Sequence, residues 1–278
     1  MEDKTKLELK KTATKVRMGI ITAVSSAGSG HPGGSLSLAD ILTFLYFKEM
    51  NIDPKNPKNP DRDRFVLSKG HCTPALYSTL ANRGFFPVED LADFRQVSSY
   101  LEGHPNMDKV PGVDMSTGSL GQGISAAVGM AMAGKLDNKN YRVYAALGDG
   151  ELEEGQVWEA AMCASHYKLD NLTAFIDYNG LQIDGNITEV MNPEPIADKF
   201  AAFGWNVISI NAHNFDEIEQ AVNKAKAFKG KPTAIVAHSI KGKGVSYMEN
   251  QAGWHGSAPK KEQAEQAQAE LESYLKSL

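Results

Sequence analysis

The sequence is poor in several features that would assign it to a specialised class of protein. Its 278 residues include only two cysteines, Cys72 and Cys163, which is too few for a disulfide framework. No apolar run approaches the roughly 18 residues that a transmembrane helix needs. Residues 1–6 are mostly charged and lack the apolar core of a signal peptide. We therefore expect a reducing, cytoplasmic location.

An excess of positive charge is also missing. The chain has 29 lysines and arginines against 34 aspartates and glutamates, which gives a formal net charge of -5 at pH 7. Nucleic acids and anionic membrane surfaces attract basic faces, so we expect neither as a partner. The remaining composition, 42% hydrophobic and 23% charged, is that of an ordinary globular protein. The length suffices for one large domain or two small ones.

What the sequence does contain is an alternation of helical patterns with short apolar runs. The first 60 residues predict helices over 4–27 and 36–50, separated by a Gly/Ser-rich loop and followed by a loop rich in proline and asparagine. Five apolar runs then predict strands at 65–67, 141–147, 172–178, 207–210 and 233–237. Further helices are predicted near 73–82, 120–136, 153–168, 194–203, 214–228 and 258–278.

Continuously apolar strands joined by helices are typical of a parallel sheet covered on both faces. We therefore predict a doubly wound α/β fold with a mostly parallel sheet and helices on both sides. The expected organisation is a single domain over 1–278, with 1–60 as a helical N-terminal extension and 258–278 as a terminal helix.

Two predicted strand ends carry residues suited to a metal and a phosphate. One strand runs into Gly148-Asp149-Gly150 and the next into Asn179. The helix between them makes a βαβ unit, so both ends should lie side by side where such sheets bind ligands. A carboxylate, an amide oxygen and a backbone carbonyl suit Mg²⁺ or Ca²⁺ completed by water and a diphosphate. The two glycines let the backbone approach phosphate oxygens, and the helix near 153 offers its positive end.

The alternative is that both segments are ordinary turns, since Asp-Gly and Asn-Gly pairs are common turn formers. Their occurrence at equivalent ends of adjacent strands favours the binding site. Three other acidic positions have simpler interpretations: Asp177 as an outer acceptor or a cap, Asp184-Gly185 as a turn, and the charged run 61–64 as a solvated loop.

Four of the seven histidines lie beside glycines in predicted loops. A single loop histidine is usually a surface residue, but four of them next to glycines that permit close approach indicate a ligand site. Histidine suits sugar chemistry because it donates, accepts or transfers a proton near neutral pH. The four are His31, His71, His104 and His255, whereas His166, His213 and His238 lack this context.

Together these motifs resemble the transketolase family. Gly148-Asp149-Gly150, followed about 30 residues later by Asn179, is similar to the thiamine diphosphate signature, which decarboxylases and dehydrogenase subunits share. The four histidine loops, the run Gly118–Gly123 and the run Lys241–Glu249 follow the transketolase order, and the resemblance spans 15–257.

The resemblance implies thiamine diphosphate as cofactor and a role for each matching residue. The metal, Mg²⁺ or alternatively Ca²⁺ or Mn²⁺, would bind Asp149, Asn179 and the carbonyl of Leu181. His71 and His255 would line the diphosphate and the reacting carbons, His31 and His104 would face sugar hydroxyls, and Glu154 would be a buried interface glutamate. The implied catalytic set is His31, His71, His104, His255 and Glu154. The implied cofactor-binding set is His71, Gly118, Ser119, Leu120, Gly148, Asp149, Gly150, Glu151, Asn179, Ile183 and His255.

Transketolases transfer a two-carbon ketol unit from a ketose phosphate to an aldose phosphate. Their full chains carry two further domains, a pyrimidine-binding and a C-terminal one, whose residues are not in this sequence. The resemblance therefore implies that the partner is a separate C-terminal transketolase subunit. It also implies self-association of this chain, and sugar phosphates as substrates.

Three other interpretations compete with this one. An α subunit of a 2-oxo-acid dehydrogenase shares Asp149 and Asn179, but the four histidines argue against it. In 1-deoxyxylulose-phosphate synthase, a closer relative, the segments matching Lys69-Gly70-His71 and the His104 loop differ. A non-catalytic subunit would have no chemical reason to keep these residues together.

Overall fold

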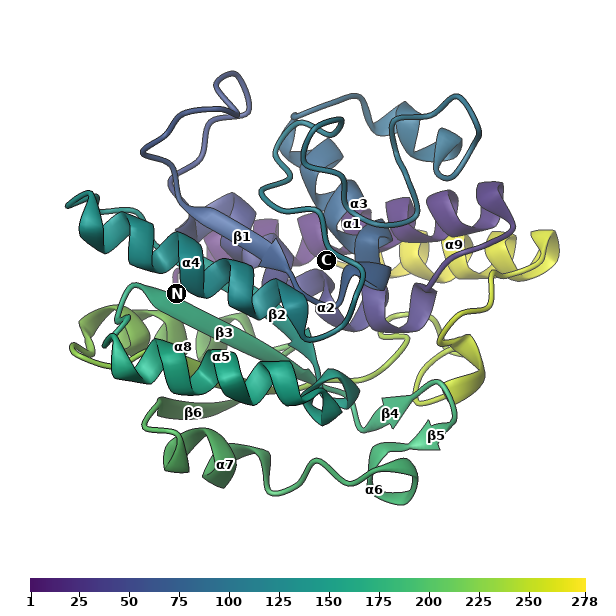
Figure 1. The fold of residues 1–278 in the computed structure, drawn as a ribbon. Coiled ribbons are helices and arrows are strands. Elements are labelled where there is room, and N and C mark those ends of the chain that lie inside the picture. Colours follow the sequence, from purple (N-terminus) through teal and green to yellow (C-terminus); the bar gives the residue numbers. More distant parts are fainter.

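The computed structural model describes all residues 1–278 and contains one central five-stranded parallel sheet. The strand order is β1-β2-β3-β7-β6, and every neighbouring pair is parallel (Figure 1). The strands are β1 (Arg64–Leu67), β2 (Val143–Gly148), β3 (Leu172–Tyr178), β6 (Asn206–Asn211) and β7 (Thr233–His238). All five predicted strands are confirmed, with ends that differ from the prediction by two residues at most.

Helices cover both faces of this sheet. They are α1 (Asp3–Ala27), α2 (Pro32–Phe44), α3 (Thr73–Arg83), α4 (Gln122–Leu136), α5 (Gly155–His166), α6 (Ile187–Val190), α7 (Ile196–Ala202), α8 (Phe215–Ala227) and α9 (Lys261–Ser277). α4 and α5 lie on one face, and α1, α2, α3 and α8 on the other (Figure 1).

Side chains of the strands alternate between two hydrophobic cores, one on each face. On β2, Tyr144 and Ala146 belong to a core of 45 buried residues shared with α1, α2, α3 and α8. Val143, Ala145 and Leu147 belong to a second core of 22 buried residues shared with α4, α5 and α7. A strand buried on both faces has no polar side, which explains its continuous apolar sequence. The predicted doubly wound α/β fold is therefore confirmed.

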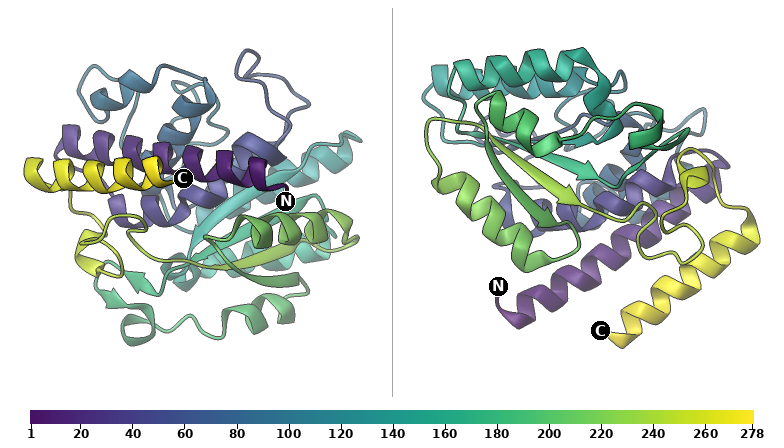
Figure 2. Two further views of the ribbon diagram at one scale, coloured as in Figure 1. Left: turned by 180° about the vertical axis from the view of Figure 1, so that it is seen from behind. Right: turned by 90° about the horizontal axis from the view of Figure 1, so that it is seen from below.

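The two terminal helices lie side by side against the larger core. Figure 2 shows α9 running along α1, with both chain ends on this side of the molecule. Ala264, Ala267 and Leu271 of α9 are buried there together with Val16 and Ile20 of α1. The predicted N-terminal helices thus pack into the main core. None of the helices is both long and apolar enough to cross a membrane.

The direction of winding reverses between β3 and β7. The connection from β2 to β3 runs through α5 on one face, whereas that from β6 to β7 runs through α8 on the other. Where two such halves meet, the loops leaving the carboxyl ends of the strands diverge and leave a crevice that binds ligands in sheets of this kind. The loops after β3 and β7 are therefore the expected place for a site.

Two local expectations need correction. The helix predicted over 36–50 begins earlier, at Pro32, because proline suits the first turn of a helix and the two glycines that follow it are buried. It continues from Leu45 to Glu49 as a π-helix. The charged run 61–64 is only partly solvated, with Asp61 exposed as expected. Arg62 and Asp63 are buried, since Arg62 pairs with Asp114 and Asp63 accepts the backbone N–H of Asn51 and of Arg142.

Candidate active site

Asp149 and Asn179 meet at the carboxyl edge of the sheet, as predicted from the βαβ unit. Asp149 follows β2 and accepts two backbone hydrogen bonds, from Gly150 N at 2.9 Å and from Gly180 N at 2.6 Å. The Asn179 side-chain oxygen accepts from Leu181 N at 3.1 Å. Gly180 has a φ of 76°, a left-handed conformation that favours glycine in this tight turn. The Asp149 carboxylate therefore rests directly on the turn that presents Asn179 and Leu181.

Asp149 is a buried carboxylate without a salt-bridge partner. It is 3% exposed, and burial, followed by the nearby charge of Asp177, raises its pKa to about 6. No group of three or more His, Cys, Asp or Glu side chains is placed to hold a metal ion. The local donors are one carboxylate, one amide oxygen and one carbonyl, which suit a hard divalent cation that takes its remaining ligands from water and a diphosphate. The residues present thus fit such an ion.

The loops of the site are joined by a buried ion pair between Lys69 and Asp177. Lys69 is 2% exposed, and its ammonium donates to the Asp177 carboxylate. It also donates to Gly34 O at 2.9 Å. Asp177 is fully buried and also accepts from the hydroxyls of Ser37 and Ser239. Burial opposes the charge of Asp177, but Lys69 and these hydrogen bonds outweigh it and keep the pKa below the ordinary value.

Asp177 also orients the predicted metal ligand. The Asn179 side-chain nitrogen donates to Asp177 at 3.4 Å, a long contact that turns the amide oxygen the other way. Asp177 is thus placed as expected of an outer acceptor, and its role towards a metal stays a prediction. Groups of this kind fix the orientation of metal ligands in many sites.

A second buried lysine, Lys241, connects the turn after β3 with a histidine. Its ammonium donates to Leu181 O at 2.9 Å and lies 3.0 Å from His255 Nδ1. Lys241 is 1% exposed, and burial lowers its pKa. A carbonyl oxygen has two lone pairs, so Leu181 can bind Lys241 and still face a cation.

Three of the four predicted histidines form one cluster. The rings of His71 and His255 stack with centroids 5.2 Å apart, and the ring of His31 approaches them at 5.1 and 5.7 Å. Burial, with nearby positive charges, lowers the pKa of His31 to about 4 and that of His255 to about 3, and it also lowers the pKa of His71. All three rings are therefore neutral at pH 7, and each can accept a proton or donate one hydrogen bond.

His104 lies at the exposed rim of this cluster. Its ring packs on Gly118, where an added Cβ would be 3.2 Å from a ring carbon, and Tyr77 donates to its carbonyl at 3.2 Å. Burial, followed by the charge of Arg95, lowers the pKa of His104. Arg95 donates to Ser29 in the His31 loop and to Gly103 O in the His104 loop at 3.5 Å, so the guanidinium connects the two histidine loops.

The loop Gly118–Gly121 is tied to the strand ends by Glu151. The buried Glu151 carboxylate accepts from Ser68, from Gly121 N at 2.9 Å and from Gly148 N at 3.0 Å. Its assignment to the cofactor stays a prediction, as do those of Ser119 and Leu120. Two other assigned side chains are exposed in the single chain: Glu154, predicted as a buried interface residue, and Ile183, which is 63% exposed.

Lys69, Lys241 and Arg95 also belong to the site, although no sequence motif assigned them a role. A signal for the two lysines was available. Lys69 follows β1 by two residues and Lys241 follows β7 by three, and both precede a glycine. Side chains directly beyond the carboxyl ends of parallel strands line the ligand crevice. Arg95 follows no strand and carried no comparable signal.

Known proteins resemble this chain over nearly its whole length. Residues 9–274 match the model of the transketolase thiamine diphosphate binding domain. The chain is 48% identical over 266 residues to the 6-deoxy-6-sulfo-D-fructose transketolase subunit SqwG of Clostridium sp. (strain MSTE9), which covers 96% of this chain and 97% of that protein. It is 45% identical over 264 residues to one of the subunits of the apulose-4-phosphate transketolase of Phocaeicola vulgatus, covering 95% and 94%.

Longer transketolases match through part of their length. The chain is 44% identical to human transketolase over 277 residues, which is 99% of this chain but 44% of that protein. Transketolase from Campylobacter jejuni superposes with a TM-score of 0.90 at 36% identity, covering 98% of this chain and 43% of that one. The chain spans less than half of these longer relatives. By sequence and by fold, the chain belongs to the transketolase thiamine diphosphate binding domain family.

Proposed function

We propose that the chain is the thiamine diphosphate- and metal-binding subunit of a transketolase, which transfers a two-carbon ketol unit between sugar phosphates. The observation that carries this proposal is the buried, unpaired Asp149 on the Asn179 turn, next to the cluster of His31, His71 and His255. No lysine or arginine of the chain forms an ion pair with the Asp149 carboxylate, and the neutral rings offer proton donors and acceptors.

The residues of this chain would bind the cofactor through its diphosphate end. Asp149, Asn179 and the Leu181 carbonyl would hold Mg²⁺, with Ca²⁺ or Mn²⁺ as alternatives, and the metal would in turn bind the diphosphate. When bound, thiamine diphosphate would supply a nucleophilic carbon and an acceptor for the electron pair of the carbon–carbon bond that breaks next to the ketone. His71 and His255 would then transfer protons at the reacting carbons, and His31 and His104 would orient the sugar hydroxyls.

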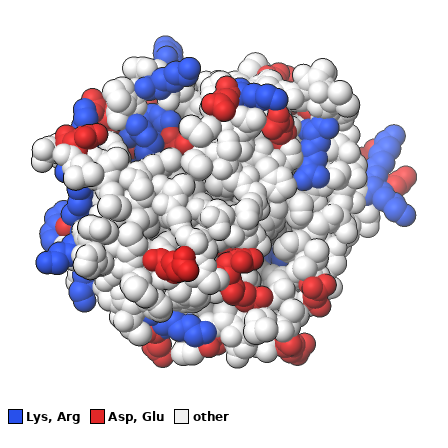
Figure 3. Space-filling view, viewed as in Figure 1, with Lys and Arg blue, Asp and Glu red and all other residues white.

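One surface of the chain suits a protein partner. Helix α4 carries no charged residue from Gln122 to Gly134, although Gly129 and Ala133 are exposed. On the neighbouring helix α5, Met162 is 62% exposed. Figure 3, in the same view as Figure 1, shows few charged side chains over the middle of this face. A helix that is apolar all round is normally buried, which supports a partner on α4 and α5.

The partner we propose is a separate subunit that carries the pyrimidine-binding and C-terminal domains. Two relatives that match this chain over nearly their whole length are named as transketolase subunits, which supports this division. We propose two copies of each subunit, with self-association of this chain and two active sites. The exposed Glu154, which precedes α5, would become buried at that interface.

The proposal predicts that ketol transfer requires both subunits. The purified chain, supplied with thiamine diphosphate, Mg²⁺, a ketose phosphate and an aldose phosphate, should form no product, because its partner must complete the cofactor site. Adding a partner subunit that carries the pyrimidine-binding and C-terminal domains should restore transfer, measured by coupled assay. Robust transfer by the chain alone would refute the two-subunit proposal, and no transfer by the pair on any sugar phosphate would refute transketolase activity.

The same assay tests the role of His104. Replacing His104 with alanine should raise the KM for the ketose and lower kcat, because a hydrogen bond to a sugar hydroxyl is lost. A loss of about 1–3 kcal/mol in kcat/KM is expected for such a bond. Thiamine diphosphate affinity, measured by calorimetry, should change little, since the ring lies at the rim of the cluster.

Gln266→Ala is the control for this variant. Gln266 is an exposed polar residue of α9 that hydrogen-bonds Glu270 on the same helix, away from α4 and α5, and its loss should leave the kinetics unchanged. Weak cofactor binding with normal sugar kinetics would instead show that His104 contacts the cofactor and not the sugar.

A further inference from the structure

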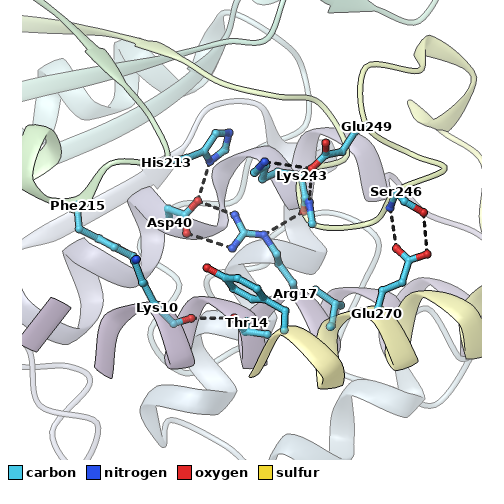
Figure 4. A pocket seen from close by; sticks show the side chains of 13 residues that line it. Lys10, Thr14, Arg17, Asp40, His213, Phe215, Lys243, Ser246, Glu249 and Glu270 are labelled. Atoms are coloured by element: carbon cyan, nitrogen blue, oxygen red, sulfur yellow. Dashed lines mark hydrogen bonds and ion pairs between the residues drawn. The ribbon is translucent and has the colours of Figure 1, made fainter. Parts of the chain in front are cut away.

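A buried hydrogen-bonded network of three polar side chains lies behind the loop that carries Lys241. Arg17 of α1 forms two hydrogen bonds with Asp40 of α2, at 3.1 and 2.6 Å. The same carboxylate contacts Nδ1 of His213, beyond β6, at 2.7 Å. Figure 4 shows the three side chains joined in this way, and all three line a cavity of about 390 Å³. Arg17 is 6% exposed and Asp40 likewise, so the contacts are shielded from solvent.

The two outer members of this network, His213 and Arg17, bind the backbone on either side of Lys241. The N–H of Ile240 donates to His213 Nε2 at 2.9 Å, and Arg17 Nε donates to the carbonyl of Lys243 at 3.0 Å. Between them, the N–H of Gly242 donates to Gly33 O at 2.9 Å. The carbonyl of Lys241 accepts from Asn250 N at 2.9 Å, so all four residues from 240 to 243 are anchored through the backbone while the Lys241 side chain projects into the site.

The contacts also fix the proton on His213. Because the Ile240 N–H is a donor, Nε2 must accept, and the remaining proton is on Nδ1, where it donates to Asp40. The negative charge of Asp40 stabilises this tautomer, and the charge of Arg17 compensates Asp40 in turn. Arg17, Asp40 and His213 are therefore hydrogen-bonded in series, each to the next.

We propose that Arg17, Asp40 and His213 are positioning residues that hold Lys241 in place, so that its ammonium binds Leu181 O and His255 Nδ1 together. This inference rests on the proposed function, since it gives the contacts of Lys241 a role in binding the metal and cofactor. A long lysine side chain reaches two acceptors at once only if its backbone is fixed, and small displacements in the supporting residues loosen such a site.

Two substitutions of His213 separate its two hydrogen bonds. His213→Asn keeps a donor at the place of Nδ1, facing Asp40, but is too short to accept from Ile240. His213→Gln extends an acceptor to Ile240. With the partner subunit present, calorimetry with thiamine diphosphate and Mg²⁺ should show affinity reduced about 10-fold in His213→Asn, as for other groups that orient metal ligands. The cofactor affinity of His213→Gln should stay within a factor of about 3 of that of the unmodified protein, a smaller change than the roughly 10–100-fold that the loss of such orienting groups causes.

Hydrogen exchange in the cofactor-free chain provides a readout that does not depend on activity. Peptides covering 239–250 should exchange faster in His213→Asn than in His213→Gln, because the Ile240 amide has lost its acceptor. Ile218→Val is the stability control, since it shortens a fully buried side chain of α8 without touching this network. It should change neither cofactor affinity nor exchange over 239–250.

Combination with Lys241→Met tests whether His213 acts through Lys241. If it does, His213→Asn should cause no further loss of cofactor affinity once Lys241 is replaced. Losses that multiply, or His213→Asn with unchanged affinity, would overturn the inference. Failure of the unmodified two-subunit protein to bind thiamine diphosphate would instead refute the proposed function, so the two failures are distinguishable.

Discussion

Replacing Asp149 with alanine should abolish Mg²⁺-dependent binding of thiamine diphosphate while the chain stays folded. The carboxylate is the one charged metal ligand that we assign, so its loss should cost more than the roughly 10–100-fold that outer groups cost. The fold should tolerate the change because Asp149 is buried without a cationic partner, and only the N–H groups of Gly150 and Gly180 lose an acceptor. Calorimetry with the partner subunit present measures the effect.

The cofactor-free chain offers a second measurement on the same variant. The pKa of Asp149 is raised from 3.8 to about 6, so its carboxyl binds more protons in the folded chain than in the unfolded one. Its contribution to stability is therefore present below about pH 4 and lost as the pH rises through 6. Asp149→Ala should remove this part of the pH dependence in urea unfolding.

Asp184→Ala is the matched control. Asp184 is an exposed aspartate in the turn between β4 (Leu181–Gln182) and β5 (Gly185–Asn186), a few residues beyond Asn179. This variant should bind metal and cofactor normally. Tight Mg²⁺-dependent binding by Asp149→Ala would disprove our assignment of the metal ligand.

The sequence predicts the parts of this site that depend on local chain order. Apolar runs locate all five strands, because strands buried on both faces leave no polar positions. The loops after β2 and β3 follow from the βαβ connection, which makes those strands neighbours. Asp149 and Asn179 could therefore be placed together without a structure.

Contacts between distant segments could not be predicted in this way. Lys69 and Asp177 are 108 residues apart, and their pairing depends on the positions of β1 and β3 in the sheet and on the approach of α2. The order β3-β7-β6 also reverses the chain order of β6 and β7, which no periodicity shows. The sequence pattern indicated solvated Arg62 and Asp63 for the same reason: their partners Asp114 and Arg142 come much later in the chain.

Replacing Lys69 with methionine should destabilise the chain by about 3–5 kcal/mol, the cost of leaving one member of a buried ion pair uncompensated. Asp177 would keep its hydrogen bonds from Ser37 and Ser239 but lose the charge that offsets its burial. Urea unfolding monitored by circular dichroism measures the change. Lys109→Met is the matched control, because its ion pair with Glu102 is exposed and should contribute about 0–1 kcal/mol.

The pH dependence of the stability of this variant distinguishes an electrostatic contribution of Lys69 from a packing contribution. In the unmodified chain the pKa of Asp177 is lowered, so the pair contributes stability above the ordinary carboxyl pKa and loses it in acid. Without Lys69, burial should raise the pKa of Asp177, so the variant loses stability as the pH rises instead. The difference between the two proteins should shrink from pH 7 towards pH 4, and Asp177→Asn should offset much of the loss in the double variant. A difference independent of pH, with additive effects of the two substitutions, would mean that Lys69 stabilises the chain by packing alone.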